Sequence, residues 1–310
     1  MTAAPKLRLG TRQSPLAMAQ AHEARDRLCA AHGWDESAVE LVPVRASGDK
    51  VQDRPLAELG GKALWTKELD AWLHESRIDA AVHSMKDVET LRPAFLHIGA
   101  ILEREDRADN LLGARSIQAL PQGATVGTSA PRRAAQLLNM RPDCRVVTFR
   151  GNVATRMAKL AAGEVDATFL ARAGLNRLGE TGVGVRLDPS DWLPAPGQAA
   201  IGIECRTDDA ETRDLLAPLD HAPSRVEVMA ERALLAGLGG SCHSAVGVLT
   251  SWEGERLSIT AAIWSTDGAR RIEDSLSCDP GDAEARARAL AGRLLEAAPP
   301  LVRTHFGGAA

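Results

Sequence analysis

Arginine side chains gather in one part of the sequence. Between Gly127 and Arg177 the chain has eight arginines and one lysine against three acidic residues, a local charge of +6. The whole chain of 310 residues has a net charge of −4, so the remainder carries −10. A guanidinium presents paired N–H donors that fit a carboxylate or a phosphate. The excess predicts a specific anionic ligand at this segment, and the negative total argues against nucleic acid.

The arginines stand where predicted strands lead into predicted helices. At such junctions, free backbone N–H groups and the helix dipole already favour an anion. For any one arginine the alternative is a solvated helix face, but several groups recurring at such junctions favour a binding site. Phosphate is an alternative ligand, although neither the P-loop nor the dinucleotide glycine fingerprint occurs. The arginines concerned are Arg132, Arg133, Arg150, Arg156 and Arg177.

A second group of chemically capable residues is the run His83-Ser84-Met85-Lys86-Asp87. It ends a short apolar run that predicts a buried strand, and the end of such a strand can present a carboxylate to a cleft. Lys86 and Asp87 then form either an acid/base pair or a structural ion pair.

The third group is Gly239-Gly240-Ser241-Cys242-His243, in which a cysteine stands in a glycine-rich loop after a predicted helix. Such a thiol is either an exposed nucleophile or an inert buried group. A Cys–His dyad is disfavoured because adjacent side chains point apart. The five cysteines are odd in number and contain no C-x-x-C pair, which argues against a disulfide framework or a zinc ribbon. A reducing cytosol is the expected compartment.

Two α/β units and a different third segment must position these groups. Up to about residue 170 the chain alternates predicted strands (6–10, 40–44, 80–83, 96–102, 125–127, 145–149, 167–170) with predicted helices (15–32, 66–76, 131–140, from 152). This order predicts two similar lobes. A helix over 224–237, strands over 245–250, 256–264 and 271–277, and a final helix over 282–297 predict a small α+β domain. The N-terminus lacks an apolar signal core, and no run is long enough to span a membrane.

Taken together, seven strings resemble the porphobilinogen deaminase family and follow that family's order. They are Leu9-Gly-Thr-Arg-Gln-Ser-Pro-Leu-Ala, Gly60-Gly-Lys, Ala81-Val-His-Ser-Met-Lys-Asp-Val, Val126-Gly-Thr-Ser, Arg150-Gly-Asn-Val-Ala-Thr-Arg, Ala173-Gly-Leu-Asn-Arg-Leu-Gly and Gly202-Ile-Glu-Cys-Arg. The resemblance extends to about Cys242, and beyond Val248 only the general pattern matches.

The resemblance implies two lobes like those of type II periplasmic binding proteins and a small α+β C-terminal domain. The implied domains are 1–102 with 199–219, 103–198, and 220–310. It also implies a dipyrromethane cofactor in thioether linkage to Cys242. Four porphobilinogen molecules then condense with loss of ammonia to give the linear tetrapyrrole hydroxymethylbilane, which passes to uroporphyrinogen-III synthase. The implied protein is a cytoplasmic monomer without a metal.

The resemblance also implies roles for single residues. Asp87 assists the loss of ammonia and stabilises the cationic azafulvene formed from the pyrrole. The residues that bind cofactor and substrate are Arg12, Ser14, Lys62, Trp65, Lys86, Thr128, Ser129, Arg132, Arg133, Arg150, Asn152, Arg156 and Arg177. The chain departs from the family at Ala130-Pro131, where a serine and a leucine are usual, and in the residues that flank Cys242.

Two other functions are consistent with parts of the sequence. A non-enzymatic two-lobed protein that binds a small anion explains the arginines and the lobes, but not the third domain with its cysteine. A transferase that uses Cys242 as a transient nucleophile explains the thiol. The intact mass separates these classes. A permanent adduct of two pyrroles supports the deaminase, a bare chain the binder, and a substrate-dependent adduct the transferase.

Overall fold

The computed structural model describes residues 4–44 and 66–306. The chain divides into two compact units, the first made of Met1–Glu105 and Ala199–Arg225 and the second of Asp106–Gln198 and Val226–Ala310. Lys62 and Trp65 lie outside the described residues, so their binding roles stay predictions.

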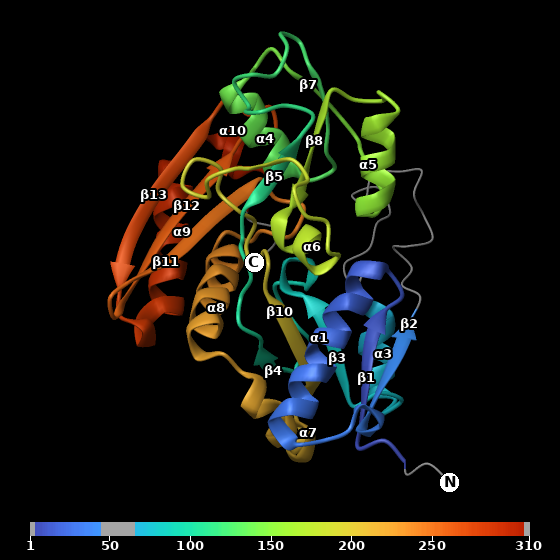
Figure 1. The fold of residues 1–310 in the computed structure, drawn as a ribbon. Helices are drawn as coiled ribbons and strands as arrows, with labels where there is room; N and C mark the ends of the chain where they lie inside the picture. The colour runs from blue at the N-terminus through green and yellow to red at the C-terminus, as the bar shows by residue number, and fades with distance from the viewer. Residues whose placement is uncertain (1–3, 45–65, 307–310) are drawn as a thin grey trace. The chain divides into compact units, whose positions relative to one another are not determined.

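The first unit is an α/β lobe built on a five-stranded sheet with the order β2-β1-β3-β10-β4 (Figure 1). β1 pairs in parallel with β2 and β3, whereas β10 runs antiparallel to β3 and β4. The strands are β1 (Leu7–Arg12), β2 (Val39–Val44), β3 (Ala80–Ser84), β4 (Leu96–Ile101) and β10 (Ile201–Arg206). The helices are α1 (Pro15–His32), α3 (Lys67–His74) and α7 (Ala210–Leu216).

Local sequence signals explain the bounds of α1. The hydroxyl of Ser14 accepts a hydrogen bond from the N–H of Ala17, and Pro15 occupies the first helical position. Gly33 adopts a left-handed conformation, with φ of 63°, and ends the helix. The buried face of α1 includes Ala21, Ala24 and Leu28, which pack with the apolar residues of the sheet.

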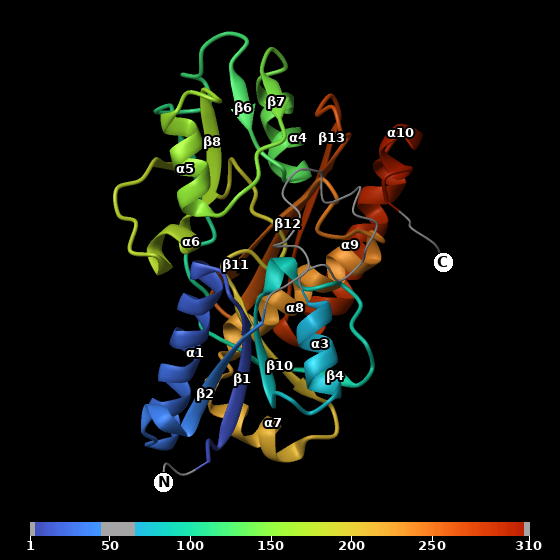
Figure 2. The ribbon, with the colours of Figure 1, turned by 90° about the vertical axis from the view of Figure 1, so that its right-hand side faces the viewer.

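The second unit contains another α/β lobe, whose five-stranded sheet has the order β7-β6-β8-β5-β9. β6 pairs in parallel with β7 and β8, and β5 runs antiparallel to β8 and β9. Figure 2 shows α5 and α6 beside β8. The elements are β5 (Asp109–Leu112), β6 (Thr125–Gly127), α4 (Pro131–Met140), β7 (Arg145–Val147), α5 (Val153–Ala161), β8 (Ala167–Ala171), α6 (Arg172–Arg177) and β9 (Val185–Arg186).

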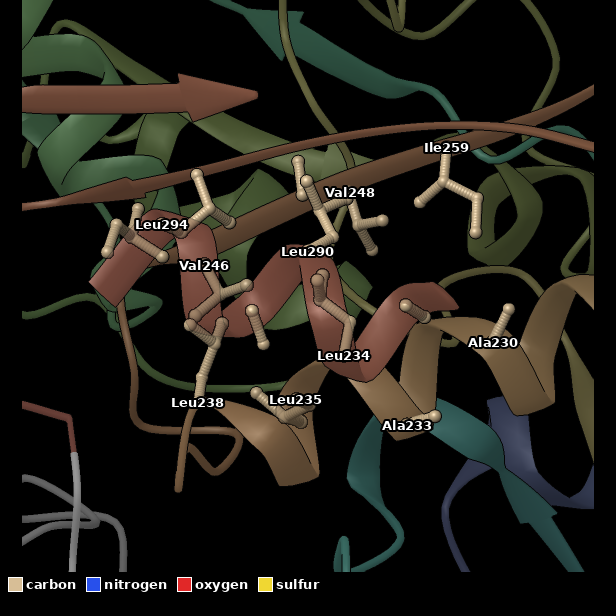
Figure 3. Packing of buried hydrophobic residues seen from close by; sticks show 14 of the residues in the cluster. Ala230, Ala233, Leu234, Leu235, Leu238, Val246, Val248, Ile259, Leu290 and Leu294 are labelled. Carbon is tan, nitrogen blue, oxygen red and sulfur yellow. The ribbon is translucent and has the colours of Figure 1, made fainter. Parts of the chain in front are cut away.

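The C-terminal part of the second unit is a three-stranded antiparallel sheet with helices packed on it. Figure 3 shows its core, in which Leu234 of α8 and Leu238, just after that helix, lie near Leu290 and Leu294 of α9. Val246, Val248 and Ile259 of the sheet complete this cluster. The elements are α8 (Ala222–Gly237), β11 (Val246–Glu253), β12 (Arg256–Trp264), β13 (Arg271–Cys278), α9 (Ala283–Ala297) and α10 (Pro300–Arg303).

The predicted fold class is confirmed: two α/β lobes and a small α+β C-terminal domain are present. The division into three domains stays a prediction, because residues 106–198 and 226–310 form a single compact unit. Within that unit, Gly247 of β11 lies so close to Leu193 that an added Cβ would stand 2.7 Å from the leucine Cβ. Among the described residues, no helix has the length and apolar character needed to cross a membrane.

Candidate functional site

Asp87 lies in a short 3-10 turn, Met85–Asp87, that directly follows β3. The N–H of Met85 donates to the carbonyl of Ala200 (3.0 Å), and the side chain of Met85 is buried. Gly202 of β10 makes this packing possible, since a Cβ there would stand 2.1 Å from the Met85 sulfur. The turn that presents Asp87 is therefore fixed by β10, a strand from a distant part of the chain.

A small cavity of the first unit brings Asp87 and Arg12 together. Its lining also includes Gln20, Thr66, His83 and Ser84. The amide of Gln20 donates to the hydroxyl of Ser84 over 2.8 Å, which orients both groups at the cavity wall. Two predicted site residues, Asp87 and Arg12, thus share one cavity, and their roles in it stay predictions. Of the others in this unit, Ser14 is the cap of α1 and Lys86 is partly buried in the turn beside Asp87.

A buried charged network begins at His83, one of the residues that line this cavity. The imidazole Nε2 of His83 lies 3.2 Å from the carboxylate of Glu204, which is fully buried. Arg92 donates to both oxygens of Glu204 (2.9 and 2.8 Å) and to Asp70 (2.6 Å). Burial by itself would raise the pKa of Glu204, but His83 and Arg92 outweigh it and lower that pKa to about 2.

Replacing Glu204 by glutamine is expected to destabilise the protein in a pH-dependent way. Because the pKa of Glu204 is lowered from 4.5 to about 2 in the folded state, its contribution is present above pH 4.5 and is lost as pH falls toward 2. Glu204→Gln should therefore lower the free energy of unfolding by about 3 kcal/mol at pH 7 and by roughly 1 kcal/mol at pH 3. Urea unfolding of both proteins at both pH values checks this. A difference in the free energy of unfolding between parent and variant that does not change with pH would contradict it.

Arg132 and Arg133 lie in the first turn of α4, and both are buried around the carboxylate of Asp109 on β5. Arg133 donates through Nε (3.0 Å) and Nη2 (2.7 Å) to the two oxygens of Asp109, and Arg132 donates through Nη2 (2.8 Å). Burial by itself would raise the pKa of Asp109, but the two guanidiniums hold it well below its usual range. The structure thus groups the two arginines, and binding of an external anion by them stays a prediction.

The turn before α4 is held by its own side chains. The hydroxyl of Thr128 accepts from the N–H of Ala130 (3.2 Å), and that of Ser129 accepts from the N–H of Phe149 (3.1 Å). Ala130 and Pro131 lack a side-chain donor and Pro131 lacks an N–H as well, so the departure from the family removes donors at this helix start.

Arg156 forms no ion pair with any acid of residues 4–44 and 66–306. Its Nε donates to the carbonyl of Gly151 (3.0 Å), and among the described residues no carboxylate lies within ion-pair distance of it. Burial, together with the charges of Arg133 and Arg150, lowers the pKa of Arg156 to about 10. Arg133 and Arg150 therefore lie close enough to Arg156 to act on its charge, and the three form an arginine cluster.

The start of α5 sets the position of Arg156. Asn152 is the cap, and its Oδ1 accepts from the N–H of Thr155 over 2.9 Å. Gly151 has φ of 124°, and a Cβ there would stand 2.6 Å from the Thr155 side chain, so only glycine fits. Arg177 is the last residue of α6 and is partly buried, and its binding role stays a prediction.

Cys242 is exposed, whereas Cys29, Cys144, Cys205 and Cys278 are buried free thiols. It lies in the loop between α8 and β11, where the N–H of Ser241 donates to the hydroxyl of Ser244 (3.0 Å). Burial, the main cause, raises the pKa of Cys205 to about 11, so its reactive thiolate is scarce. Cys242 is thus the accessible thiol of the five, and its role as the attachment point of the cofactor stays a prediction.

Sequence reasoning missed the acidic residues that organise both sites, Asp109 and Glu204. A signal for each exists in the sequence. Glu204 interrupts an otherwise apolar run, Ile201–Cys205, and Asp109 precedes Asn110-Leu111-Leu112 at the start of a short apolar segment. A charge inside a predicted buried strand needs a partner of opposite charge, and this indicates a structural ion pair.

Comparisons with known proteins cover almost the whole chain. A family model described as porphobilinogen deaminase, dipyromethane cofactor binding domain, matches residues 7–214, and one described as porphobilinogen deaminase, C-terminal domain, matches residues 225–296. The porphobilinogen deaminase of Sphingopyxis alaskensis is 55% identical over 306 residues, covering 97% of this chain and 96% of that protein. That of Paracoccus denitrificans is 47% identical over 296 residues, covering 94% and 95%.

Among solved structures, a substrate-binding domain of an amino acid ABC transporter from Streptococcus pneumoniae matches with a TM-score of 0.42 and 12% identity. The match covers 72% of this chain and 96% of that domain.

Proposed function

Because the chain belongs to the porphobilinogen deaminase family, we propose that Asp87, Cys242 and the arginine cluster carry out this family's reaction here. In that reaction four porphobilinogen molecules condense head to tail with release of ammonia, and hydroxymethylbilane results. The reading of the chain as a non-enzymatic anion binder is not supported by these relatives.

The excess positive charge at Arg156 is the observation that supports the binding role best. Each porphobilinogen brings two carboxylates, so the growing product is a polyanion. A partly buried guanidinium that pairs with no acid in the described part of the chain gains stabilisation when such a carboxylate arrives, because the surroundings screen the charges less than water does. Arg150 and Arg133 contribute to the same local potential, and Thr128, Ser129 and Asn152 stand at the adjoining helix starts.

The thiol of Cys242 fits the dipyrromethane cofactor, since its sulfur is exposed while the other four are buried. When bound through a thioether, the cofactor supplies the pyrrole carbon to which the first substrate is joined. Cys242 itself acts as an anchor, because a thioether sulfur has no proton to exchange. Arg132, Arg133, Arg150, Arg156 and Arg177 would hold the cofactor and product carboxylates.

Asp87 is the proposed acid/base group. Its carboxylate stands at a cavity wall beside Arg12, on a turn that β10 holds in place. A carboxylate at this point accepts the proton that the condensation releases and stabilises positive charge on the substrate as ammonia leaves. Arg12, Ser14 and Lys86, and outside the described residues Lys62 and Trp65, would bind substrate on this unit.

Arg156→Gln tests the binding role. Losing one charge-assisted contact of about 2 kcal/mol should raise the KM for porphobilinogen roughly thirtyfold. Arg288→Gln is the matched control, because Arg288 is an exposed arginine of α9 with its own partner, Glu284, at 3.3 Å. Steady-state kinetics of both variants measure KM, which should rise in Arg156→Gln and stay at the parent value in Arg288→Gln. An unchanged KM in Arg156→Gln would remove this arginine from the binding site.

We propose a cytoplasmic monomer with three domains, 1–102 with 199–219, 103–198 and 220–310, whose product passes to uroporphyrinogen-III synthase. The four buried free thiols suit a reducing compartment.

A further inference from the structure

The carboxylate of Asp109 accepts an unusual number of hydrogen bonds for one buried group. Its side chain is fully buried, and four side chains donate to it. Two of these are the guanidiniums of Arg132 and Arg133. The others are the indole N–H of Trp192 (2.9 Å) and the amide of Gln198 (2.9 Å).

These bonds fix the orientation of both guanidinium planes. Arg133 meets Asp109 side-on through Nε and Nη2, a bidentate geometry that leaves the guanidinium little freedom to rotate. Its Nη1 also donates to the carbonyl of Phe169 (3.0 Å). Arg132 uses Nη2 for Asp109 and Nη1 for the carbonyl of Leu193 (2.6 Å).

The carboxylate is itself held in place by neutral donors. Trp192 is buried and stacks on Phe169 of β8, with ring centroids 4.7 Å apart. Gln198 donates both to Asp109 and to the backbone carbonyl of Arg107 (2.7 Å). Asp109 therefore has a defined position before any ligand arrives.

The charges of the two arginines explain why a carboxylate is needed between them. Arg132 and Arg133 are adjacent in sequence and both buried, so without an acid between them they would repel each other. One carboxylate against two guanidiniums holds them together and leaves one positive charge. That charge adds to the one on Arg156, which lies within the electrostatic reach of Arg133.

We propose that Asp109 is a positioning residue, which holds Arg132 and Arg133 in the orientation that binds the carboxylates of cofactor and substrate. This inference rests on the proposed function of the arginine cluster. Asp109 itself touches no ligand in this proposal and acts through the two arginines alone.

Asp109→Asn tests the proposal in the full-length protein. The amide has the size of the carboxylate, but it lacks the charge and turns one donor toward a guanidinium. We expect KM for porphobilinogen to rise about a hundredfold, as misplaced binding groups do. We also expect the fraction of chains carrying the dipyrromethane, measured by intact mass, to fall below about one tenth. Asp109→Glu restores the charge and should bring KM back to within roughly tenfold of the parent value.

Leu111→Ala is the matched control for stability. Leu111 lies on the same strand and is fully buried, yet it belongs to the apolar cluster and not to the polar group at Asp109. It should lower the melting temperature while leaving KM and cofactor occupancy as in the parent protein. If Asp109→Asn folds and likewise lowers the melting temperature without changing KM or cofactor occupancy, Asp109 is a structural residue only and the proposal is overturned.

A milder variant covers the case in which Asp109→Asn does not fold. Trp192→Phe removes one neutral donor and leaves both ion pairs, and it should raise KM about fivefold. An unchanged KM in Trp192→Phe would overturn the proposal.

Arg133→Met distinguishes the positioning role of Asp109 from the binding role of the arginines. If Arg133→Met impairs binding and the Asp109 and Trp192 variants do not, only the positioning role fails. If Arg133→Met keeps the parent KM and occupancy, the binding role of the arginines fails.

Discussion

Asp87→Asn is expected to lower kcat about a thousandfold, because it removes the carboxylate that accepts a proton and stabilises the cation formed when ammonia leaves. Asparagine keeps the size of the side chain, and Asp87 lies on a turn held by backbone bonds and by the buried Met85. Folding should therefore be retained. Single-turnover and steady-state rates, together with a melting curve, measure both effects.

The control for this variant is Asp26→Asn on α1. Asp26 is an exposed aspartate that pairs with Arg25, and its side chain is 60% accessible. The same chemical change there should leave kcat as in the parent protein. Asp87→Glu keeps a carboxylate but moves it by one methylene, and an intermediate rate is expected. Near-parental turnover in Asp87→Asn would remove Asp87 from the acid/base role.

Cys242→Ser is expected to abolish both the covalent adduct and the activity. A serine hydroxyl does not form the thioether, so the chain has no primer on which substrate can be joined. Intact mass should show the bare chain, and Ehrlich's reagent should give no colour. The parent protein should show the mass of two added pyrrole units and a positive colour reaction.

Buried cysteines supply the controls for this experiment. Cys205→Ala and Cys278→Ala should keep the adduct, because both thiols are buried and burial raises the pKa of each. Peptide mapping locates the adduct directly. Pyrroles found on Cys205 or Cys278 would show that the wrong sulfur had been assigned, whereas an adduct seen only in the presence of substrate would favour a transient nucleophile.

The sequence alone determined the local features of this protein. A cap, a proline at the first helical position and a glycine at the end define α1, and all three signals lie within or next to the helix. The strand that precedes Asp87 and the helices that carry Arg132 and Arg156 were predicted near their observed bounds for the same reason. The candidate residues came from residue type and from family strings, which need no knowledge of distant contacts.

Only the tertiary structure decided which carboxylates form ion pairs with which arginines. Asp109 meets Arg132 and Arg133 from more than twenty positions away, and Glu204 meets Arg92 from 112 positions away. β5 and β10 were missed as strands, and each enters its sheet antiparallel to neighbours from elsewhere in the chain. Pairing over such distances depends on the whole packed sheet, because a short apolar run does not specify its partner. The candidate residues could therefore be predicted from the sequence, whereas the acids that pair with the arginines were determined only by the tertiary structure.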